Sequence, residues 1–395
     1  MKQQLLVIGN GMAGMRMVET LLALAPQRYA ITVIGREPLG NYNRVLLSPV
    51  LAGEKAFADT LIHDRDWYVE NGVQLLAGET VERVDLATRC VQTDQRQLHW
   101  DRLVFASGSQ PRMPVIPGID HPKVSGFRSL RDVEKLLNAS GPVVVLGGGF
   151  LGIEAAAALK AQGRDVTLVH HKPWLLDRQL DAKAGELLLA QLRRRGIRCE
   201  LNSGVTEVTE QGAVLTNGSV VMAEQVVIAI GVQPESALAQ AAGVPCQRGI
   251  CVDRQLRSTI PNVYAVGECC EIAGETFGLV APCLAQAEVL GAQLADAPLA
   301  DFYHEKSGTR LKVSGISLFS AGDIREAPSL TSFDPLSGHY RRLFLKHGRL
   351  NGVLLFGDSQ QGASLLTRLN AAEQISLNTL FGLDEPETQP QAAGS

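Results

Sequence analysis

Residues 4–14 read QLLVIGNGMAG, and this short stretch decides how the first part of the chain folds. An apolar run of strand length leads directly into the pattern G-x-G-x-x-G, with its glycines at Gly9, Gly11 and Gly14. The helix-like stretch MRMVETLLALA and the strand-like stretch YAITVIG follow. In such a βαβ unit the first glycine makes a tight turn, the second lets backbone approach a pyrophosphate, and the third lets helix and strand pack closely. We therefore expect a dinucleotide phosphate at the N-terminus of the first helix.

The same pattern recurs in the middle of the chain. Residues 141–171 read GPVVVLGGGFLGIEAAAALKAQGRDVTLVHH, which places Gly147, Gly149 and Gly152 between a strand and an Ala-rich helix. One such motif can arise by chance in a turn, whereas two copies with correct flanking elements favour two nucleotide-binding folds over two ordinary glycine turns. One dinucleotide could be a tightly held flavin and the other a diffusing nicotinamide, a pairing typical of electron-transfer enzymes.

Two further segments end in glycine-containing turns. Trp100–Arg112, WDRLVFASGSQPR, and Pro261–Cys269, PNVYAVGEC, each read as a buried strand followed by small residues. Taken singly, each is more typical of an ordinary strand end. Beside two glycine motifs, both are expected at the carboxyl edge of an α/β sheet, where ligands bind.

Composition excludes several classes of function. Of the 395 residues 45% are hydrophobic and 20% charged, which is typical of a globular protein with room for two or three domains. A formal net charge of −4 argues against a nucleic-acid partner. The sequence contains no apolar run near the ~18 residues that span a bilayer, and its N-terminus lacks signal-peptide features. We therefore expect a cytoplasmic protein with neither a nucleic-acid nor a membrane partner.

The seven cysteines are scattered along the chain. They form no C-x-x-C pair and no Cys/His spacing typical of zinc or iron–sulfur ligands, so we expect no metal site. Reduced structural thiols are the favoured interpretation for a cytoplasmic chain.

These segments, in this order, resemble the pyridine-nucleotide flavoprotein oxidoreductases, and within them the rubredoxin/ferredoxin reductase group. The likeness is closest to the N-terminal flavin portion of assimilatory NAD(P)H nitrite reductase large subunits and runs from Gly9 to about Gly382. The phrases that carry it are YNRVLLSPVLAGE, FASGSQPR, GGGFLGIEAA, DRQLD, VYAVGECCE, FGLVAP and LKVSGI. The resemblance implies an α/β fold with two Rossmann-like domains, one for FAD and one for NAD(P).

The resemblance also implies a domain order. We expect the FAD-binding domain in residues 1–110 and 240–304, and the NAD(P)-binding domain in residues 111–239. Residues 305–382 contain alternating stretches around a turn at Lys346–Arg349 and then a helix-like stretch ending at Gly382, which predicts a small α+β C-terminal domain. The polar, Pro-containing residues 383–395 are expected to be a disordered tail.

Cofactor-binding residues follow from the resemblance by position. Those implied around FAD are Gly9, Gly11, Ala13, Gly14, Arg44, Val81, Ala106, Ser107, Gly108, Arg128, Gly267, Glu268, Val280 and Pro282. Those implied around NAD(P) are Gly147, Gly149, Gly152, Glu154 near the nicotinamide, and Gly231 lining the cleft.

The position expected to bind the FAD adenosine ribose departs from the family pattern. The acid usually found there aligns with Arg36, and Glu37 follows it. A carboxylate accepts hydrogen bonds from both ribose hydroxyls, whereas an arginine only donates. Either Glu37 makes this contact or the contact is lost.

The second motif leaves the choice between NADH and NADPH open. His170, His171 and Lys172 follow its second strand, where an acid would favour NADH and a basic cluster NADPH. A solvated strand end is the alternative for both histidines. Because NADH-dependent relatives in the nitrite-reductase branch often lack the acid, we favour NADH slightly.

Residues 40–50, GNYNRVLLSPV, contain no cysteine, although disulfide reductases of this superfamily carry a redox cysteine pair in the region. The resemblance therefore implies hydride transfer from the nicotinamide to the flavin, then one-electron steps to an external acceptor, with no catalytic side chain. The favoured acceptor is a separate assimilatory nitrate or nitrite reductase. The alternatives are a small iron–sulfur carrier of the rubredoxin or ferredoxin type, and a redox-sensing flavoprotein that acts as a binding module.

A homodimer is compatible with the family. Two further features have two interpretations each. Cys283 lies near the expected flavin edge, as either a structural or a reactive thiol. A basic group in the C-terminal region could dock an acidic carrier, although charged strand faces are usually only solvated. Its members are Arg341, Arg342, Lys346 and Arg349.

Overall fold

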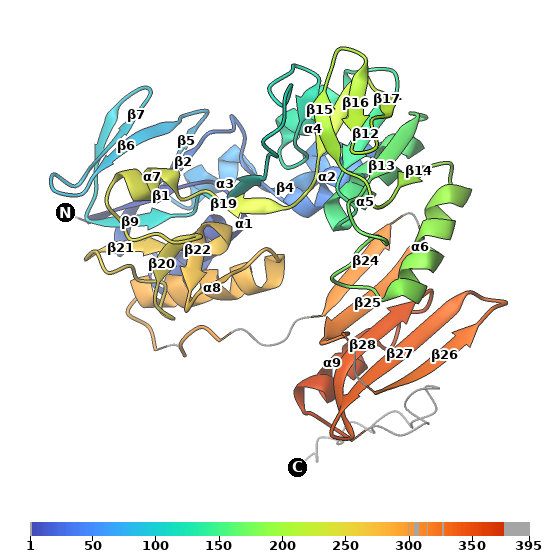
Figure 1. The fold of residues 1–395 in the computed structure, drawn as a ribbon. Coiled ribbons are helices and arrows are strands. Elements are labelled where there is room, and N and C mark those ends of the chain that lie inside the picture. Colours follow the sequence, from blue (N-terminus) through green and yellow to red (C-terminus); the bar gives the residue numbers. More distant parts are fainter. Residues whose placement is uncertain (1, 299, 304–307, 314, 326–327, 375–395) are drawn as a thin grey trace. The chain divides into compact units, whose positions relative to one another are not determined.

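The computed structural model describes residues 2–298, 300–303, 308–313, 315–325 and 328–374. The chain divides into two compact units, the first made of residues 1–140 and 227–304 and the second of residues 141–226 and 305–395. Figure 1 shows the elements of both units.

The first unit is built on a five-stranded parallel sheet with strand order β21-β9-β1-β2-β5. Its strands are β1 (Gln3–Ile8), β2 (Tyr29–Gly35), β5 (Val73–Ala77), β9 (Arg102–Phe105) and β21 (Val263–Ala265). The central strands are apolar and buried, as expected where helices cover both faces of a parallel sheet. The predicted first βαβ unit is therefore confirmed.

Helix α1 (Met12–Leu24) buries Met15, Val18 and Leu21, which share one face because they are spaced three residues apart. It packs against α8 (Val280–Leu294) at Gly291, where a Cβ would lie 2.6 Å from Thr20. Only glycine allows the two helices to approach this closely.

Short elements complete the first unit. Its remaining strands are β3 (Asn41–Tyr42), β4 (Leu61–His63), β6 (Val81–Asp85), β7 (Cys90–Thr93), β8 (Gln97–His99), β10 (Ser109–Pro111), β11 (Val124–Ser125), β19 (Val232–Pro234), β20 (Ile250–Val252), β22 (Cys270–Ile272) and β23 (Glu275–Thr276). Its remaining helices are α2 (Leu47–Leu51), α3 (Arg65–Glu70), α4 (Leu130–Leu137) and α7 (Ala237–Ala241), with the 3-10 turns η1 (Arg44–Leu46), η2 (Phe57–Thr60) and η3 (Gly267–Cys269).

The second unit repeats the nucleotide-binding pattern. Strands β12 (Val143–Leu146), β13 (Val166–Val169) and β14 (Arg198–Glu200) are parallel neighbours, joined by α5 (Phe150–Ala161) and α6 (Ala182–Arg194). This confirms the second predicted βαβ unit. The other strands of this part are β15 (Val205–Val208), β16 (Gly212–Leu215) and β17 (Val220–Met222), which form an antiparallel sheet, and β18 (Gln225–Ile228) at the boundary between the units.

The C-terminal part of the second unit is an antiparallel sheet with strand order β24-β25-β28-β27-β26. Its elements are β24 (Thr309–Val313), β25 (Ile316–Gly322), β26 (Ser329–Asp334), β27 (His339–Lys346), β28 (Arg349–Phe356) and α9 (Gly362–Asn370). Leu365 and Leu369 of α9 pack with Phe319, Leu343 and Val353 in a separate core. The predicted turn between β27 and β28 is confirmed, with His347 and Gly348 both at positive φ as a two-residue hairpin requires.

Helix α9 is shorter than the sequence predicts. It ends at Asn370, and Ala372 adopts a left-handed φ of 51°. The Leu350 N–H then donates to the Glu373 carbonyl at 2.8 Å, so the chain leaves the helix to meet β28. The rest of the predicted helix and the predicted tail, residues 375–395, lie outside the described residues.

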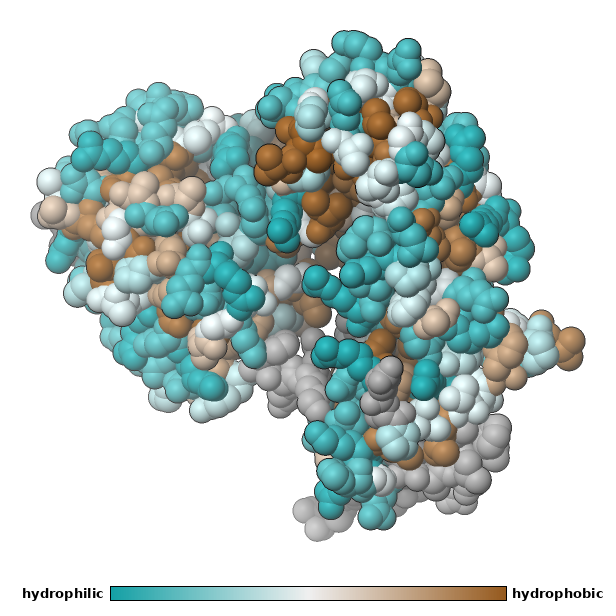
Figure 2. Space-filling model, in the orientation of Figure 1, coloured by the Kyte–Doolittle hydropathy of each residue, from teal (hydrophilic) through white to brown (hydrophobic). Residues whose placement is uncertain are grey.

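Within the described ranges, no helix combines the length and the apolar character needed to cross a membrane. The face drawn in Figure 2 is mostly hydrophilic, with small groups of hydrophobic residues, as is normal for a globular surface.

Asp181 connects the two parts of the second unit. Its carboxylate caps α6 by accepting from the Ala184 N–H at 2.9 Å, and it also accepts from Tyr340 and Arg342 of β27 at 2.7 and 2.8 Å. We expect Asp181→Ala to lower the free energy of unfolding by about 2–3 kcal/mol, because a helix cap and charge-assisted hydrogen bonds are lost together.

The matched control is Asp165→Ala, which removes an ion pair with Arg198 whose partners are each 58% exposed. It should cost less than about 1 kcal/mol. Urea unfolding followed by the fluorescence of Trp174, which lies in the same unit, compares the two variants. Equal losses would contradict the role assigned to Asp181.

Candidate functional site

The first glycine loop forms a cradle at the N-terminus of α1. Gly9 has φ +118°, and a Cβ there would lie 2.2 Å from the carbonyl oxygen of Ala106 at the end of β9. Gly14 allows α1 to approach the same place, since its Cβ would lie 2.9 Å from the Ala106 Cβ. Gly11 is the N-cap of α1, has no side-chain cap, and has no neighbouring atom within 4 Å of a built Cβ. The free first-turn N–H groups and the open space at Gly11 therefore fit a pyrophosphate.

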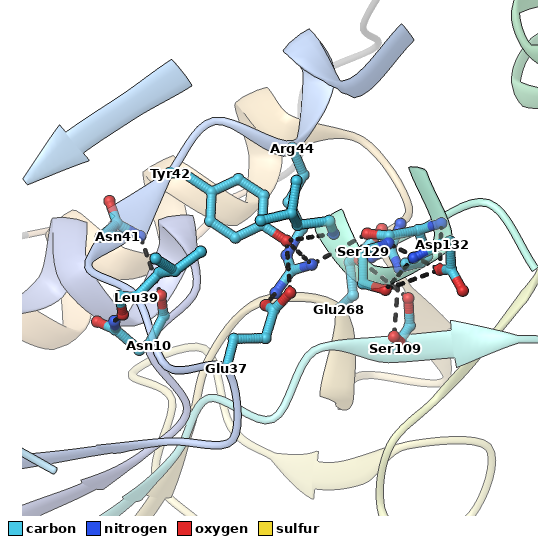
Figure 3. A network of polar contacts seen from close by, with 12 residues as sticks. Asn10, Glu37, Leu39, Asn41, Tyr42, Arg44, Ser109, Ser129, Asp132 and Glu268 are labelled. Carbon is cyan, nitrogen blue, oxygen red and sulfur yellow. Dashed lines mark hydrogen bonds and ion pairs between the residues drawn. The ribbon is translucent and has the colours of Figure 1, made fainter. Parts of the chain in front are cut away.

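Asn10 connects this loop by hydrogen bonds to the segment at Leu39–Asn41 (Figure 3). Its Nδ2 donates to the Leu39 carbonyl at 3.2 Å, and its own carbonyl accepts from Asn41 Nδ2 at 3.1 Å. The Tyr68 hydroxyl donates to Asn10 Oδ1 at 2.7 Å. Sequence reasoning missed these contacts because Asn10 occupies a variable position of the motif.

Glu37 and Arg44 form one polar group at the end of β2 (Figure 3). The Tyr42 hydroxyl donates to Glu37 Oε1 at 2.8 Å, and Arg44 pairs with the other carboxylate oxygen of Glu37. Burial raises the pKa of Tyr42, so its hydroxyl remains a donor. Each carboxylate oxygen has two lone pairs and can accept a further bond, so Glu37 remains suited to a ribose contact. Arg36 is exposed.

A second ion pair lies next to the first. Arg128 pairs with Glu268 of η3 and donates from Nε to the Ser109 carbonyl at 3.2 Å, while Ser109 Oγ donates to Glu268 at 3.0 Å. Arg44 joins the two pairs by donating to the Arg128 carbonyl at 3.0 Å. Burial, and then the charge of Arg44, lowers the pKa of Arg128 to about 10, which leaves it protonated at neutral pH. The structure thus brings together three predicted site residues that are 84 and 140 positions apart.

Other predicted FAD residues lie on segments that meet at this edge of the sheet. Ala106 is buried, and Ser107 Oγ donates to the Glu235 carbonyl at 2.7 Å. Gly108 accepts from the Glu235 N–H at 2.9 Å, and Gly231 accepts from the Arg112 N–H at 3.0 Å. Gly231 was predicted for the NAD(P) cleft and lies within the first unit.

The segment at η3 approaches α1 from β21. Gly267 has φ +85°, and its Cβ would lie 2.9 Å from the Ala13 Cβ. The Gly267 N–H donates to Oε1 of the fully buried Gln286 at 2.9 Å, a contact that the sequence alone did not indicate. Val280 and Pro282 lie in the first turn of α8, the former 37% exposed and the latter buried. Val81 begins β6 and is half-buried.

Cys283 is buried in α8, and its thiol donates to the Phe277 carbonyl at 3.6 Å. Burial raises the pKa of Cys283 to about 12, so the group is a thiol and not a thiolate at neutral pH. Since the thiolate is the nucleophile, these facts favour the structural interpretation.

The second glycine loop is a copy of the first. Gly147 has φ +120°, Gly149 is the N-cap of α5 with no side-chain cap, and open space surrounds a Cβ built on Gly149. Gly152 is buried and Glu154 half-buried in α5. His170 follows β13 but is only 5% exposed, so the solvated alternative is wrong for this residue. His171 is exposed, in agreement with the interpretation as a solvated strand end.

The basic group of the C-terminal sheet is partly paired. Arg342 binds Asp181, and Arg341 lies 4.0 Å from Asp358. Lys346 and Arg349 lie at the turn end of β27 and β28. The ion pairs of Arg341 and Arg342 disfavour a docking surface, and Lys346 and Arg349 are exposed, as the solvated alternative predicts.

Comparison with known proteins gives two family matches. Residues 3–287 match the pyridine nucleotide-disulphide oxidoreductase family. Residues 308–371 match the family of the rubredoxin NAD+ reductase C-terminal domain. Among solved structures, an NADH:rubredoxin oxidoreductase from Clostridium acetobutylicum superposes with a TM-score of 0.82 at 27% identity, covering 95% of this chain and 96% of the other.

Two curated relatives come from Bacillus subtilis. A nitrite reductase [NAD(P)H] is 39% identical over 98% of this chain and 50% of its own length. An assimilatory nitrate reductase electron transfer subunit is 38% identical over 98% of this chain and 52% of its own length. The chain thus spans about half the length of these relatives.

Gly11 offers a test of the first cradle. We expect Gly11→Ala to fold with unchanged thermal stability in the FAD-free form, because its Cβ meets open space and its φ of −87° suits alanine. The same Cβ would occupy the phosphate position and weaken FAD binding by about tenfold or more, equivalent to ~1.4 kcal/mol. Flavin absorbance of the purified protein and FAD titration measure this.

Gly9→Ala is the contrasting variant, because its Cβ would collide with the Ala106 carbonyl and should destabilise the fold itself. If Gly11→Ala retained FAD with wild-type affinity, the assignment of this loop to the pyrophosphate would fail.

Proposed function

Because the chain belongs to the pyridine nucleotide-disulphide oxidoreductase family, we propose that it passes electrons from NAD(P)H through FAD to a separate metal-containing reductase in the cytoplasm. It is an FAD-dependent oxidoreductase that uses a nicotinamide dinucleotide. The bound cofactors supply hydride acceptance and the release of single electrons. The favoured acceptor is an assimilatory nitrate or nitrite reductase, in line with the names of the two Bacillus subtilis relatives.

One observation carries this proposal. Residues 40–51, which form β3, η1 and α2, contain no cysteine and instead contribute Arg44 to the polar group with Glu37 and Arg128. A redox pair of cysteines in this segment would receive electrons within the chain. Without one here, electrons that reach the flavin are expected to leave for another protein.

The chain's own residues have two tasks in this scheme. The N-termini of α1 and α5 bind the two pyrophosphates through backbone N–H groups. Arg128 and Glu268, held by Ser109 and Arg44, orient the polar part of the flavin nucleotide, and Glu37 accepts from its adenosine ribose. The proposed scheme assigns no side chain the role of a nucleophile or a general base.

A small iron–sulfur carrier is the second candidate acceptor. The match of residues 308–371 to the rubredoxin NAD+ reductase C-terminal domain and the likeness to an NADH:rubredoxin oxidoreductase favour it. The third candidate function is that of a redox sensor, which would turn over NAD(P)H more slowly than an electron-transfer enzyme does.

Acceptor identity is tested with the flavin-loaded protein under anaerobic conditions. We expect NADH or NADPH to bleach the flavin absorbance rapidly, and a purified assimilatory nitrate or nitrite reductase to restore it faster than rubredoxin or ferredoxin does. Restoration by rubredoxin alone would favour the second candidate, and slow turnover with ferricyanide the sensor.

Gly149→Ala is the matched control for this test, since its Cβ would enter the open space at the N-terminus of α5. It should keep its flavin and accept electrons from dithionite as the wild type does, but require about tenfold or more NAD(P)H for the same rate of flavin reduction. A protein that binds no flavin at all would contradict every candidate.

We further propose NADH as the preferred donor. The buried His170 accepts a hydrogen bond from a backbone N–H, so it offers no cation to a 2′-phosphate, although His171 and Lys172 are exposed. We expect a higher kcat/KM for NADH than for NADPH with ferricyanide as acceptor, by about threefold to tenfold, or ~1 kcal/mol. A higher value for NADPH would show that the exposed cations decide the preference.

A further inference from the structure

His170 is directed toward the second glycine loop and not toward solvent. Its Nδ1 accepts from the Gly148 N–H at 3.1 Å, and a Cβ built on Gly148 would lie 2.7 Å from the ring Cγ. The ring therefore packs against the middle residue of the Gly147–Gly149 turn. Gly148 is also held from its other side, because its carbonyl accepts from the Leu176 N–H at 2.9 Å.

This hydrogen bond fixes the state of the imidazole. A backbone N–H only donates, so Nδ1 carries no proton and the neutral ring holds its proton on Nε2. Nε2 lies 3.3 Å from Asp177 Oδ1, within ion-pair distance, although the angles do not make a hydrogen bond. A second proton would convert Nδ1 to a donor facing another donor, and the contact with Gly148 would be lost.

We propose that His170 is a positioning residue for dinucleotide binding. Its neutral ring draws the Gly148 N–H inward, which keeps the Gly147–Gly149 turn shaped so that the N-terminus of α5 faces the pyrophosphate. Protonation of the ring releases this turn and weakens binding. The inference rests on dinucleotide binding at this loop and does not depend on which protein accepts the electrons.

The groups around the ring set the pH range of this effect. Burial lowers the pKa of His170. The nearby Asp177 carboxylate favours the protonated ring, while His171, with ring centroids 5.1 Å apart, disfavours it. From β14 and the segment after it, the Glu200 carbonyl accepts from the His170 N–H at 2.8 Å, and the Ser203 N–H donates to the His170 carbonyl at 3.0 Å. Because burial lowers the pKa of His170 overall, the ring is neutral at neutral pH, and dinucleotide binding weakens as the pH falls through that pKa.

The test measures dinucleotide affinity directly, by calorimetric titration of the flavin-loaded protein with tetrahydro-NAD, an analogue that cannot transfer hydride. For the wild type we expect the dissociation constant to rise by up to about fivefold to tenfold as the pH is lowered from neutral to the acid limit of folding, the size expected for one lost hydrogen bond. His170→Asn places an amide oxygen near the position of Nδ1 and does not titrate. Its affinity should be close to wild type at pH 8 and nearly independent of pH.

Three further variants locate the effect. His170→Leu removes the acceptor and should bind weakly at every pH. Asp177→Asn removes the charge that favours the protonated ring, which should shift the fall in affinity to lower pH. His171→Asn should retain the dependence on pH, whatever its effect on affinity. FAD content and thermal melting at pH 8 show that each variant is folded.

Two results would overturn the inference: a wild-type affinity that does not change with pH, or a His170→Asn variant that follows the wild-type profile. Failure of the proposed function is distinguishable from either. A chain with the expected binding profiles that passes electrons to no reductase would support the role of His170 and refute the proposed function. Absence of dinucleotide binding at any pH would refute both.

Discussion

The approach of the Gly9 backbone to the Ala106 carbonyl fixes the edge of the sheet on which the candidate FAD site depends. A single added Cβ would lie 2.2 Å from that oxygen, so the two strand ends can meet only because residue 9 is a glycine. β21 pairs with the other side of β9, which places Gly267 and Glu268 at the same edge. Three segments distant in sequence thus converge because one backbone passes directly against another.

Each partly buried charge at this edge of the sheet is paired with an opposite charge. Arg44 is paired with Glu37 and Arg128 with Glu268, and all four side chains are at most about one-third exposed. An unpaired charge at such positions would be costly, while a paired one costs much less. The pairs also fix the orientation of donors and acceptors in advance. A polar cofactor bound here meets groups that are already ordered and need little rearrangement.

The glycine spacing sufficed to predict both βαβ units, because tight turns and close helix–strand contacts leave few alternatives to glycine. The candidate site residues were likewise proposed from motifs. Their partners were not, since the pairing of Arg128 with Glu268 spans 140 residues and depends on how the sheet closes. The burial of His170 depends on residues 173–180, which pack against the second glycine loop through Leu175 and Leu176. The sequence of this segment has no helix or strand periodicity that would predict this packing. Helix α9 was predicted too long because pairing with β28 overrides the helical propensity of residues 371–374.

The two glycine loops share one motif but are held by different chemistry. In the first loop the residue between the glycines is Asn10, whose own amide takes part in the contacts with Leu39 and Tyr68. An amide does not titrate, so this anchor is indifferent to pH. In the second loop the equivalent residue is Gly148, which has no side chain, and the anchor is the imidazole of His170, which directly follows the next strand. An anchor that can be released suits a dinucleotide that must exchange at every turnover, whereas a permanent one suits a cofactor that stays bound.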